Sequence, residues 1–265
     1  MKSEPSSCRV RRCARPIEYT DGNPRAVLCL HGFTGYPGEM AYPAGRLREA
    51  GWDVRVPRLR GHGTCGEDFR RSGVADWRRQ VLGEWEEMAS RYSELCVLGH
   101  SMGGLLALDL AVKRPVDRVA LMAPLLGVRR PGMFLFKPLS LILERKSYPW
   151  KPDPAYLFFD DRDDDDNEFL GSEYWSWIWM RPLADLIRLQ AKTEKRLNRI
   201  TRPVLAIFGG EDHVIRKKGA GILKSRLKSA YRSVELPDCG HYIPYDPDEG
   251  SRISAMDEVI SWFRG

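Results

Sequence analysis

The segment LGHSMGGLLAL, residues 98–108, contains a serine whose neighbours suit nucleophilic chemistry. Gly99-His100-Ser101-Met102-Gly103 is a G-x-S-x-G pattern between an apolar run and a stretch typical of a helix. A sharp strand-to-helix turn strains its central residue and requires small residues two positions away on either side. Such a turn would lift the Ser101 hydroxyl above a sheet, beside a helix N-terminus that favours negative charge. We predict that Ser101 is a nucleophile; the alternative is a purely structural turn.

A serine hydroxyl needs a base to become a good nucleophile, and His241 is the best candidate. His241 lies in DCGHYIP, on a predicted loop between the last strand and the last helix. From there it could reach over the carboxyl edge of the sheet towards Ser101. The chain has five histidines, and the other four fit the role less well: His31 ends an early strand, His62 lies in an RGHG loop, His100 adjoins Ser101 and should point away from it, and His213 follows an acid candidate.

The base needs an acid to orient its imidazole ring and to stabilise the charged form. Asp212, in GGEDHV, follows the apolar run PVLAIF, at the sheet edge where functional groups collect. Its neighbour Glu211 is the second choice. The resulting order along the chain is Ser, Asp, His, which is the order of α/β-hydrolases and differs from those of chymotrypsin and subtilisin.

Two backbone N–H groups should form an oxyanion hole for the negative charge that develops on the substrate carbonyl oxygen. Met102, at the start of the predicted helix, would provide one of them. The other should come from the glycine-rich loop LCLHGFTGYPG (28–38), in which Phe33 lies at the expected position. Both residues would contribute main-chain atoms, although their side chains could also touch the substrate.

Short apolar runs alternate with amphipathic segments along most of the chain, which predicts an α/β fold with a mostly parallel central sheet and helices on both faces. In the segment 74–92, five apolar residues recur at three- or four-residue spacing, so its tryptophans are expected to pack against the core. We expect strands at 25–32, 52–57, 94–100, 117–124, 203–210 and 231–237, and helices at 39–50, 74–92, 103–114, 216–230 and 248–264.

The alternation stops near residue 125 and resumes near residue 203. We therefore predict a hydrolase-like core at 16–124 and 201–265, with a cap or lid insertion at 125–200 over the open end of the sheet. The end of this insertion, about 182–198, should form a helix that leads back to the core. Its aromatic residues could line an acyl tunnel or form a small core of their own. The candidates for substrate binding are Trp175, Trp179 and Met180.

Charge is unevenly distributed along the chain, whose formal net charge is +6. The basic residues 1–15 are expected to form a disordered tail, because no nucleic-acid motif accompanies them. The run 160–168 has seven acidic residues and one arginine. It lacks the glycine of an EF-hand loop, so we interpret it as a solvated loop rather than a calcium site. The RGHG loop, with Arg58 and Arg60, is interpreted as a structural turn.

The six cysteines show no CxxC spacing, and three of them, Cys29, Cys96 and Cys239, lie in or beside apolar runs as buried free thiols do. No apolar run approaches the eighteen or so residues of a membrane helix, and the N-terminus lacks the apolar segment of a secretory signal. We therefore expect a cytoplasmic protein in a reducing environment, with no stable membrane insertion. Its oligomeric state is left open.

Taken together, these segments resemble the α/β-hydrolases, specifically the bacterial carboxylesterase and monoacylglycerol lipase group. The matching segments span most of the chain outside residues 1–15 and the insertion. They are HGFTG (31–35), PRLRGHGT (57–64) followed by DW (76–77), GHSMGG (99–104), GGEDHV (209–214) and GHY (240–242).

The resemblance implies hydrolysis of short- to medium-chain carboxylic esters or monoglycerides through an acyl-enzyme on Ser101. It implies no cofactor. We also expect no metal, a small acyl ester as the substrate, and no nucleic-acid partner. A thioesterase or amidase with the same three residues is the main alternative, because the sequence encodes the attack but not the leaving group. A small-molecule receptor on a hydrolase scaffold is an alternative of a different class.

Overall fold

The computed structural model describes residues 8–128, 136–152, 162–215 and 218–265. Within them, seven strands form one sheet in the order β1-β3-β2-β4-β5-β8-β9, and all neighbours are parallel except β1 and β3. The predicted mostly parallel sheet is confirmed, with β1 as an additional antiparallel edge strand. The strands are β1 (Ile17–Tyr19), β2 (Arg25–Leu30), β3 (Asp53–Val56), β4 (Glu94–His100), β5 (Val119–Met122), β8 (Val204–Gly209) and β9 (Tyr231–Leu236).

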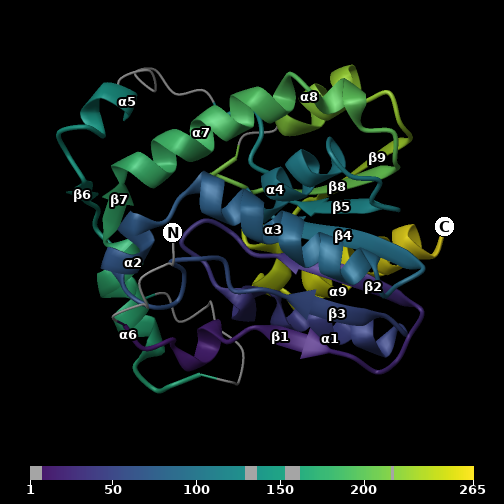
Figure 1. Cartoon of the computed structure of the whole chain (residues 1–265), viewed down its shortest axis with the longest axis horizontal. Helices are drawn as coiled ribbons and strands as arrows, with labels where there is room; N and C mark the ends of the chain where they lie inside the picture. Colours follow the sequence, from purple (N-terminus) through teal and green to yellow (C-terminus); the bar gives the residue numbers. More distant parts are fainter. Residues whose placement is uncertain (1–7, 129–135, 153–161, 216–217) are drawn as a thin grey trace.

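Helices cover both faces of this sheet and bury a separate apolar cluster on each (Figure 1). Helices α3, α4, α7 and α8 contribute to the cluster on one face, and α1 and α9 to the cluster on the other. The helices are α1 (Ala41–Glu49), α2 (Gly66–Arg71), α3 (Val74–Ala89), α4 (Met102–Ala111), α5 (Phe136–Leu139), α6 (Asp166–Leu170), α7 (Met180–Glu194), α8 (Lys218–Arg226) and α9 (Glu249–Arg264).

The apolar stripe of α3 packs into the core, as predicted. Trp77 is fully buried, and Val81 and Met88 are each 2% exposed. The indole N–H of Trp77 donates to the carbonyl oxygen of Arg60, so this ring also fixes the RGHG loop. That loop is a structural turn, as expected, since Gly61 and Gly63 both have positive φ and the His62 N–H donates to the Leu59 carbonyl.

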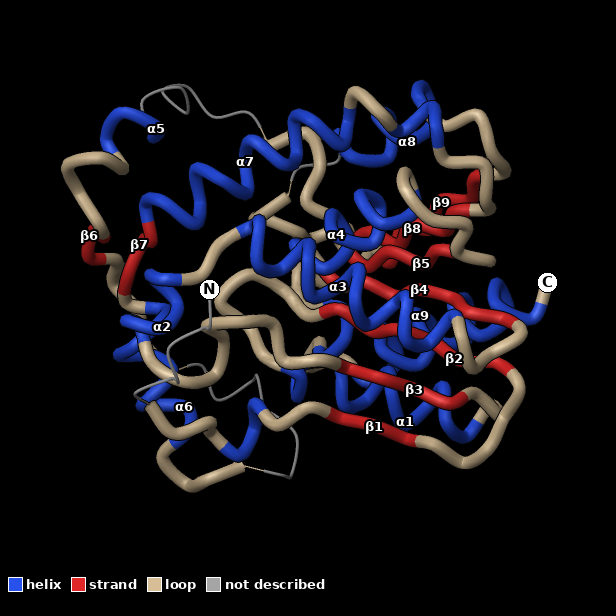
Figure 2. The backbone as a smooth tube through the Cα atoms, in the orientation of Figure 1, coloured by secondary structure: helices blue, strands red, loops and turns tan. Residues whose placement is uncertain are grey.

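The 125–200 block contains elements that gather at one end of the sheet (Figure 2). Two three-residue strands, β6 (Arg145–Ser147) and β7 (Trp177–Trp179), pair antiparallel, and a π-helical turn (Gly171–Trp175) follows α6. Helix α7 then runs back to the core and packs against α4 and α3. Sequence periodicity predicted α7 but not the short hairpin. The division into a core and an inserted cap stays a prediction.

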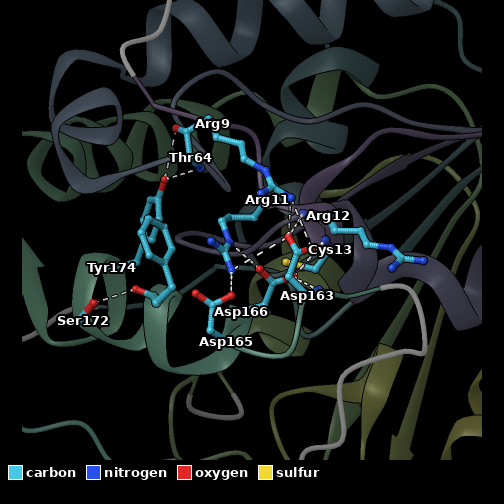
Figure 3. Close-up of polar contacts among 11 residues, drawn as sticks. Arg9, Arg11, Arg12, Cys13, Thr64, Asp163, Asp165, Asp166, Ser172 and Tyr174 are labelled. Carbon is cyan, nitrogen blue, oxygen red and sulfur yellow. Dashed lines mark hydrogen bonds and ion pairs between the residues drawn. The ribbon is translucent and has the colours of Figure 1, made fainter.

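Residues 8–15, which we call the N-terminal arm, correct the expectation of a disordered tail (Figure 3). Cys13 and Ala14 are buried in a 3₁₀ turn, and the Arg11 N–H donates to the carbonyl oxygen of Gly63. The Arg11 guanidinium pairs with Asp165 and with the buried Asp166. The first seven residues lie outside the described residues.

The acidic run is therefore more than a solvated loop. The Asp166 carboxylate also accepts the N–H groups of Cys13 (3.3 Å) and Asp163 (2.9 Å), while Asp163 pairs with Arg9 at 3.1 Å. Buried carboxylates need such partners, and the arm supplies Arg11 and the Cys13 N–H from more than 150 residues away. Residues 160 and 161 of the run lie outside the described residues.

The cysteines divide into two groups. Cys8 and Cys65 form a disulfide that ties the arm to the start of α2, which the sequence did not suggest. Cys13, Cys29, Cys96 and Cys239 are free and buried, so the expectation of buried thiols holds for the three that were singled out. Across the described ranges, no helix has both the length and the apolar character needed to cross a membrane.

Candidate active site

Ser101 lies at the turn between β4 and α4, in a conformation that L-residues rarely adopt. Its φ is 52° and its ψ is −111°. The turn is possible because its flanking residues are glycines. A Cβ on Gly99 would lie 2.4 Å from the backbone of Gly103, and a Cβ on Gly103 would lie 2.0 Å from the Leu30 carbonyl oxygen. The two glycines of the motif are therefore a steric requirement of this turn.

His241 and Asp212 lie on neighbouring loops that follow β9 and β8. The His241 Nε2 atom is 3.1 Å from Ser101 Oγ, and its Nδ1 atom is 2.8 Å from Asp212 Oδ2. Because the Asp212 carboxylate can only accept, Nδ1 carries the proton and Nε2 is free to accept from the serine hydroxyl. The side chain of Glu211, the alternative acid, is exposed. The structure thus brings together the three residues that sequence analysis selected.

The second oxygen of Asp212 fixes the carboxylate in place. Asp212 Oδ1 accepts the backbone N–H groups of Val214 (2.8 Å) and Ile215 (2.7 Å). Burial favours the neutral acid, but the hydrogen bonds from His241 and these two N–H groups outweigh it and hold the pKa of Asp212 below its ordinary value. Asp212 is therefore an anion at neutral pH, suited to stabilise a charged imidazole.

The backbone N–H groups of Phe33 and Met102 have no acceptor within the described part of the chain. Met102 is the first residue of α4, where N–H groups lack partners inside the helix. Phe33 belongs to the loop Gly32–Gly35, in which Thr34 has a φ of 59°. The Phe33 ring packs edge-on against Phe69. Both N–H groups remain available to an oxyanion.

Ser101 and His241 open into a cavity of about 290 Å³ with mainly aliphatic walls. Helix α7 supplies one wall, and Glu39 and Tyr242 lie on another. Sequence analysis missed these positions, although the apolar side of the predicted helix 182–198 was a signal for some of them. The aliphatic residues lining the cavity are Leu125, Val128, Leu183, Leu186, Ile187 and Val214.

A second cavity of about 460 Å³ adjoins the first and is mostly aromatic. Trp175 and Trp179 line this second cavity, and Met180 lines neither. The Trp175 indole N–H donates to the Thr34 carbonyl oxygen at 3.2 Å, which connects the 125–200 block to the Phe33 loop. Trp179 and Met180 are each only 1% exposed, so packing accounts for most of their surface.

His100 reaches the loop of His241 and also lines the aliphatic cavity, and its orientation away from Ser101 stays a prediction. Its Nε2 atom is 3.0 Å from the His241 carbonyl oxygen. Beside it lies Glu39, a buried carboxyl group that sequence analysis did not select. Glu39 Oε2 accepts the Gly32 N–H at 3.2 Å and lies 3.9 Å from His100 Nδ1.

The sheet order, the strained serine and the convergent loops define an α/β protein with a serine hydrolase arrangement. The model of the alpha/beta hydrolase family matches residues 27–252, and the chain belongs to that family. It is 30% identical over 259 residues to a thermostable monoacylglycerol lipase of Bacillus sp. (strain H-257), covering 93% of this chain and 94% of the relative. It is 24% identical to a carboxylesterase of Bacillus subtilis (strain 168), covering 88% and 91%.

Solved structures share the fold. A structure from work on the metagenome-derived lipolytic enzymes LipS and LipT superposes with a TM-score of 0.83 at 22% identity, covering 97% of this chain and 99% of the other. A monoacylglycerol lipase from Paleococcus ferrophilus gives a TM-score of 0.74 at 22% identity, covering 94% and 97%. These likenesses agree with the predicted fold class and family resemblance.

Proposed function

We propose that the protein is a serine hydrolase that cleaves carboxylic esters of short to medium acyl chains. The observation that carries the proposal is the continuous set of contacts from Asp212 through His241 to Ser101 Oγ, which ends in an apolar cavity. Each contact lies within hydrogen-bonding distance, and each group has the acid–base character its position requires. The named activities of the two Bacillus relatives support the same reaction.

In the first half of the reaction, Ser101 Oγ attacks the ester carbonyl carbon and gives its proton to His241 Nε2. The electron pair of the carbonyl double bond moves to oxygen, where the Phe33 and Met102 N–H groups stabilise the charge. The bond to the alcohol oxygen then breaks, and His241 transfers the proton to the departing alcohol. An acyl group remains on Ser101.

Water completes the reaction by the same route. His241 takes a proton from the water as it attacks the acyl carbon, and a second oxyanion forms in the same place. The bond to Oγ breaks, the proton returns to Ser101, and the carboxylic acid leaves. The negative Asp212 stabilises the imidazolium that forms in both halves.

We assign the acyl chain to the aliphatic cavity of about 290 Å³, because its walls along α7 carry few polar groups. A cavity of this size is at the lower end of the range for small-molecule sites, which favours short and medium chains. The alcohol part would then face the aromatic cavity that Trp175 and Trp179 line. This assigns Trp175 and Trp179 to the leaving-group side rather than to an acyl tunnel.

The compartment is a separate question. Four buried free thiols are consistent with the cytoplasmic location expected from the sequence. The Cys8–Cys65 disulfide weighs against it, because disulfides persist mainly in oxidising environments. A cytoplasmic location stays a prediction.

The test of the proposed reaction is labelling with a fluorophosphonate probe, followed by assays with p-nitrophenyl esters of graded chain length, monoglycerides and acyl-CoA. We expect labelling and ester turnover in the native protein and neither in Ser101→Ala. Ser90→Ala, which removes an exposed hydroxyl, is the matched control and should keep both.

Three outcomes would contradict the proposal. Labelling that persists in Ser101→Ala would refute the nucleophile. Preferential turnover of acyl-CoA would replace esters by thioesters as the substrate class. Labelling without turnover of any of these compounds would favour a receptor on a hydrolase scaffold.

A further inference from the structure

Glu39 is a buried acid next to the candidate active site that has no cationic partner. It lies in the 3₁₀ turn Pro37–Met40 after the Phe33 loop, and its side chain is 6% exposed. Among the described residues, no lysine or arginine forms an ion pair with it. Burial raises the pKa of Glu39 to about 8, although hydrogen bonds from Gly32 and Tyr245 act to lower it. At neutral pH, Glu39 is therefore largely a neutral carboxylic acid with one proton to donate.

His100 has a buried acceptor atom that lacks a hydrogen-bond donor. Its Nε2 must carry a proton, because it faces the His241 carbonyl oxygen at 3.0 Å and that oxygen can only accept. Burial lowers the pKa of His100 to about 3, so the ring holds only this one proton. The Nδ1 atom is then a bare acceptor, and it is buried with no hydrogen-bond partner in the described structure. A buried unsatisfied acceptor is costly.

The Glu39 carboxyl group lies close to this atom and can satisfy it. Oε2 lies 3.9 Å from Nδ1, which a small rotation of the carboxyl group would bring into hydrogen-bonding range. Gly32 lies beside both atoms, and a Cβ there would come within 3.3 Å of Nδ1 and 3.5 Å of Oε2. The glycine therefore leaves open the space that the two groups need to approach each other.

We propose that Glu39, in its protonated form, is a positioning residue that connects the oxyanion loop to the loop of the catalytic base. Its carboxyl group accepts the Gly32 N–H and donates its proton to His100 Nδ1, and His100 Nε2–H in turn holds the His241 carbonyl. One buried chain of hydrogen bonds thus sets the distance between the Phe33 N–H and the His241 imidazole. The inference rests on the proposed function, because it assigns a role relative to that reaction.

The role proposed for Glu39 depends on pH, because it depends on the number of protons that Glu39 and His100 share. The two contacts of His100 need two protons on the Glu39–His100 pair. If Glu39 loses its proton, its carboxylate faces the lone pair of His100 Nδ1 and no hydrogen bond joins them. If the ring proton of His100 then moves from Nε2 to Nδ1, the lone pair of Nε2 faces the His241 carbonyl oxygen instead. Either way one contact is lost.

No lysine or arginine is among the other titratable groups that the described structure places around the pair. They are Tyr245 and Tyr36 near Glu39, and His31, His241, Asp212 and Tyr242 near His100. Since the pKa of Glu39 is raised by folding, the contribution of this contact is complete at low pH and is lost as pH rises through about 8. The decrease in kcat above about pH 8 should therefore follow the loss of the Glu39 proton.

The test compares Glu39→Gln and Glu39→Leu with the native protein between pH 6 and 10. Glutamine supplies the donor of the neutral acid, because its NH₂ can donate to His100 Nδ1, and its oxygen remains an uncharged acceptor. We expect Glu39→Gln to keep kcat within about twofold at pH 7 and to lack the fall that the native protein shows above pH 8. Glu39→Leu should lose about tenfold in kcat at pH 6–7, with little change in KM, and this difference should narrow above pH 8, where the native protein loses the same contact. Glu49→Gln, an exposed position in α1, is the matched control.

Two readouts separate this inference from the proposed reaction. Ester turnover is followed by pH-stat titration, and the rate constant for fluorophosphonate labelling of Ser101 is measured over the same pH range. Absence of ester turnover with intact labelling would contradict the proposed function, while the labelling rates would still test Glu39. The inference is overturned if Glu39→Gln shows the same alkaline fall as the native protein, or if it loses as much activity at pH 7 as Glu39→Leu. If Glu39→Leu does not fold, the comparison of Glu39→Gln with the native protein still decides.

Discussion

At the scale of single residues, the site depends on groups whose protonation is set by their neighbours. Asp212 is kept ionised by three donors, although it is partly buried. His31 is buried and its pKa is lowered to about 4, so it accepts the Leu59 N–H through Nε2 and acts as a structural histidine. Two histidines of the chain therefore do different work, His241 as the proposed base and His31 as a structural acceptor, and their hydrogen-bond partners explain the difference.

The choice between the adjacent acids Asp212 and Glu211 can be tested directly. Asp212→Asn keeps the shape of the side chain but removes the charge that holds the His241 proton on Nδ1. We expect kcat for ester hydrolysis to fall about 10⁴-fold, by analogy with the same change in a serine protease. Glu211→Gln, at the neighbouring exposed position, should stay within about twofold. A larger loss in Glu211→Gln than in Asp212→Asn would reverse the assignment.

At the scale of elements, the N-terminal arm attaches the 125–200 block to the core. Arg11 bridges the arm to Asp165 and Asp166, and the disulfide fixes Cys8 to Cys65. The RGHG loop takes part through the Tyr174 hydroxyl, which shares its one proton between the Gly61 and Cys65 carbonyl oxygens and accepts the Thr64 N–H. Three distant segments thus meet in one polar cluster.

Replacing Asp166 by Asn should weaken this attachment. The change removes a buried charge that pairs with Arg11 and accepts two backbone N–H groups. We expect the free energy of unfolding, measured by urea denaturation, to fall by about 2–3 kcal/mol. Asp164→Asn, at an exposed position two residues earlier, is the control and should change it little. Equal effects in both variants would show that the cluster does not stabilise the fold.

Sequence analysis predicted the elements that bury apolar residues with a clear period. Six strands and the main helices follow from such patterns, but β1, β6 and β7 have only three residues each and leave no recognisable period. The three residues of the proposed catalytic set could be selected from the sequence because each lies in a short motif after a predicted strand. Glu39 and Arg11 could not be selected from the sequence. An acid or a base on an ordinary polar segment becomes buried only through partners far away in the sequence.

At the scale of the whole molecule, the fold places two adjoining cavities at the candidate active site, and Ser101 and His241 line the aliphatic one. The aliphatic and aromatic cavities share the side chains of Phe33, Glu39, Leu183 and Tyr242. Of these shared residues, Leu183 belongs to α7 and the other three lie outside the 125–200 block. Acyl and alcohol preferences should therefore be separable by substitutions in different parts of the 125–200 block.

Enlarging a side chain in the aliphatic cavity should shorten the acceptable acyl chain. Ile187 lines only this cavity and is partly exposed, so a tryptophan there would fill the cavity rather than disrupt the core. We expect Ile187→Trp to lower the ratio of kcat/KM for octanoate over acetate esters by about tenfold. Ile178→Trp, which lines only the aromatic cavity, should leave this ratio unchanged. The opposite pattern would exchange the acyl and alcohol assignments of the two cavities.

The N-terminal arm also has a consequence for the order of events during synthesis. Arg11 leaves the ribosome 155 residues before its partner Asp166. At about 5–20 residues per second, the arm waits on the order of 10–30 s before that partner exists. During this interval Cys8 and Cys65 can already meet, while Arg11 and Cys13 still lack their acidic partner. The arm is thus made well before it can reach its final contacts, which form only after the 125–200 block has been translated through its acidic run.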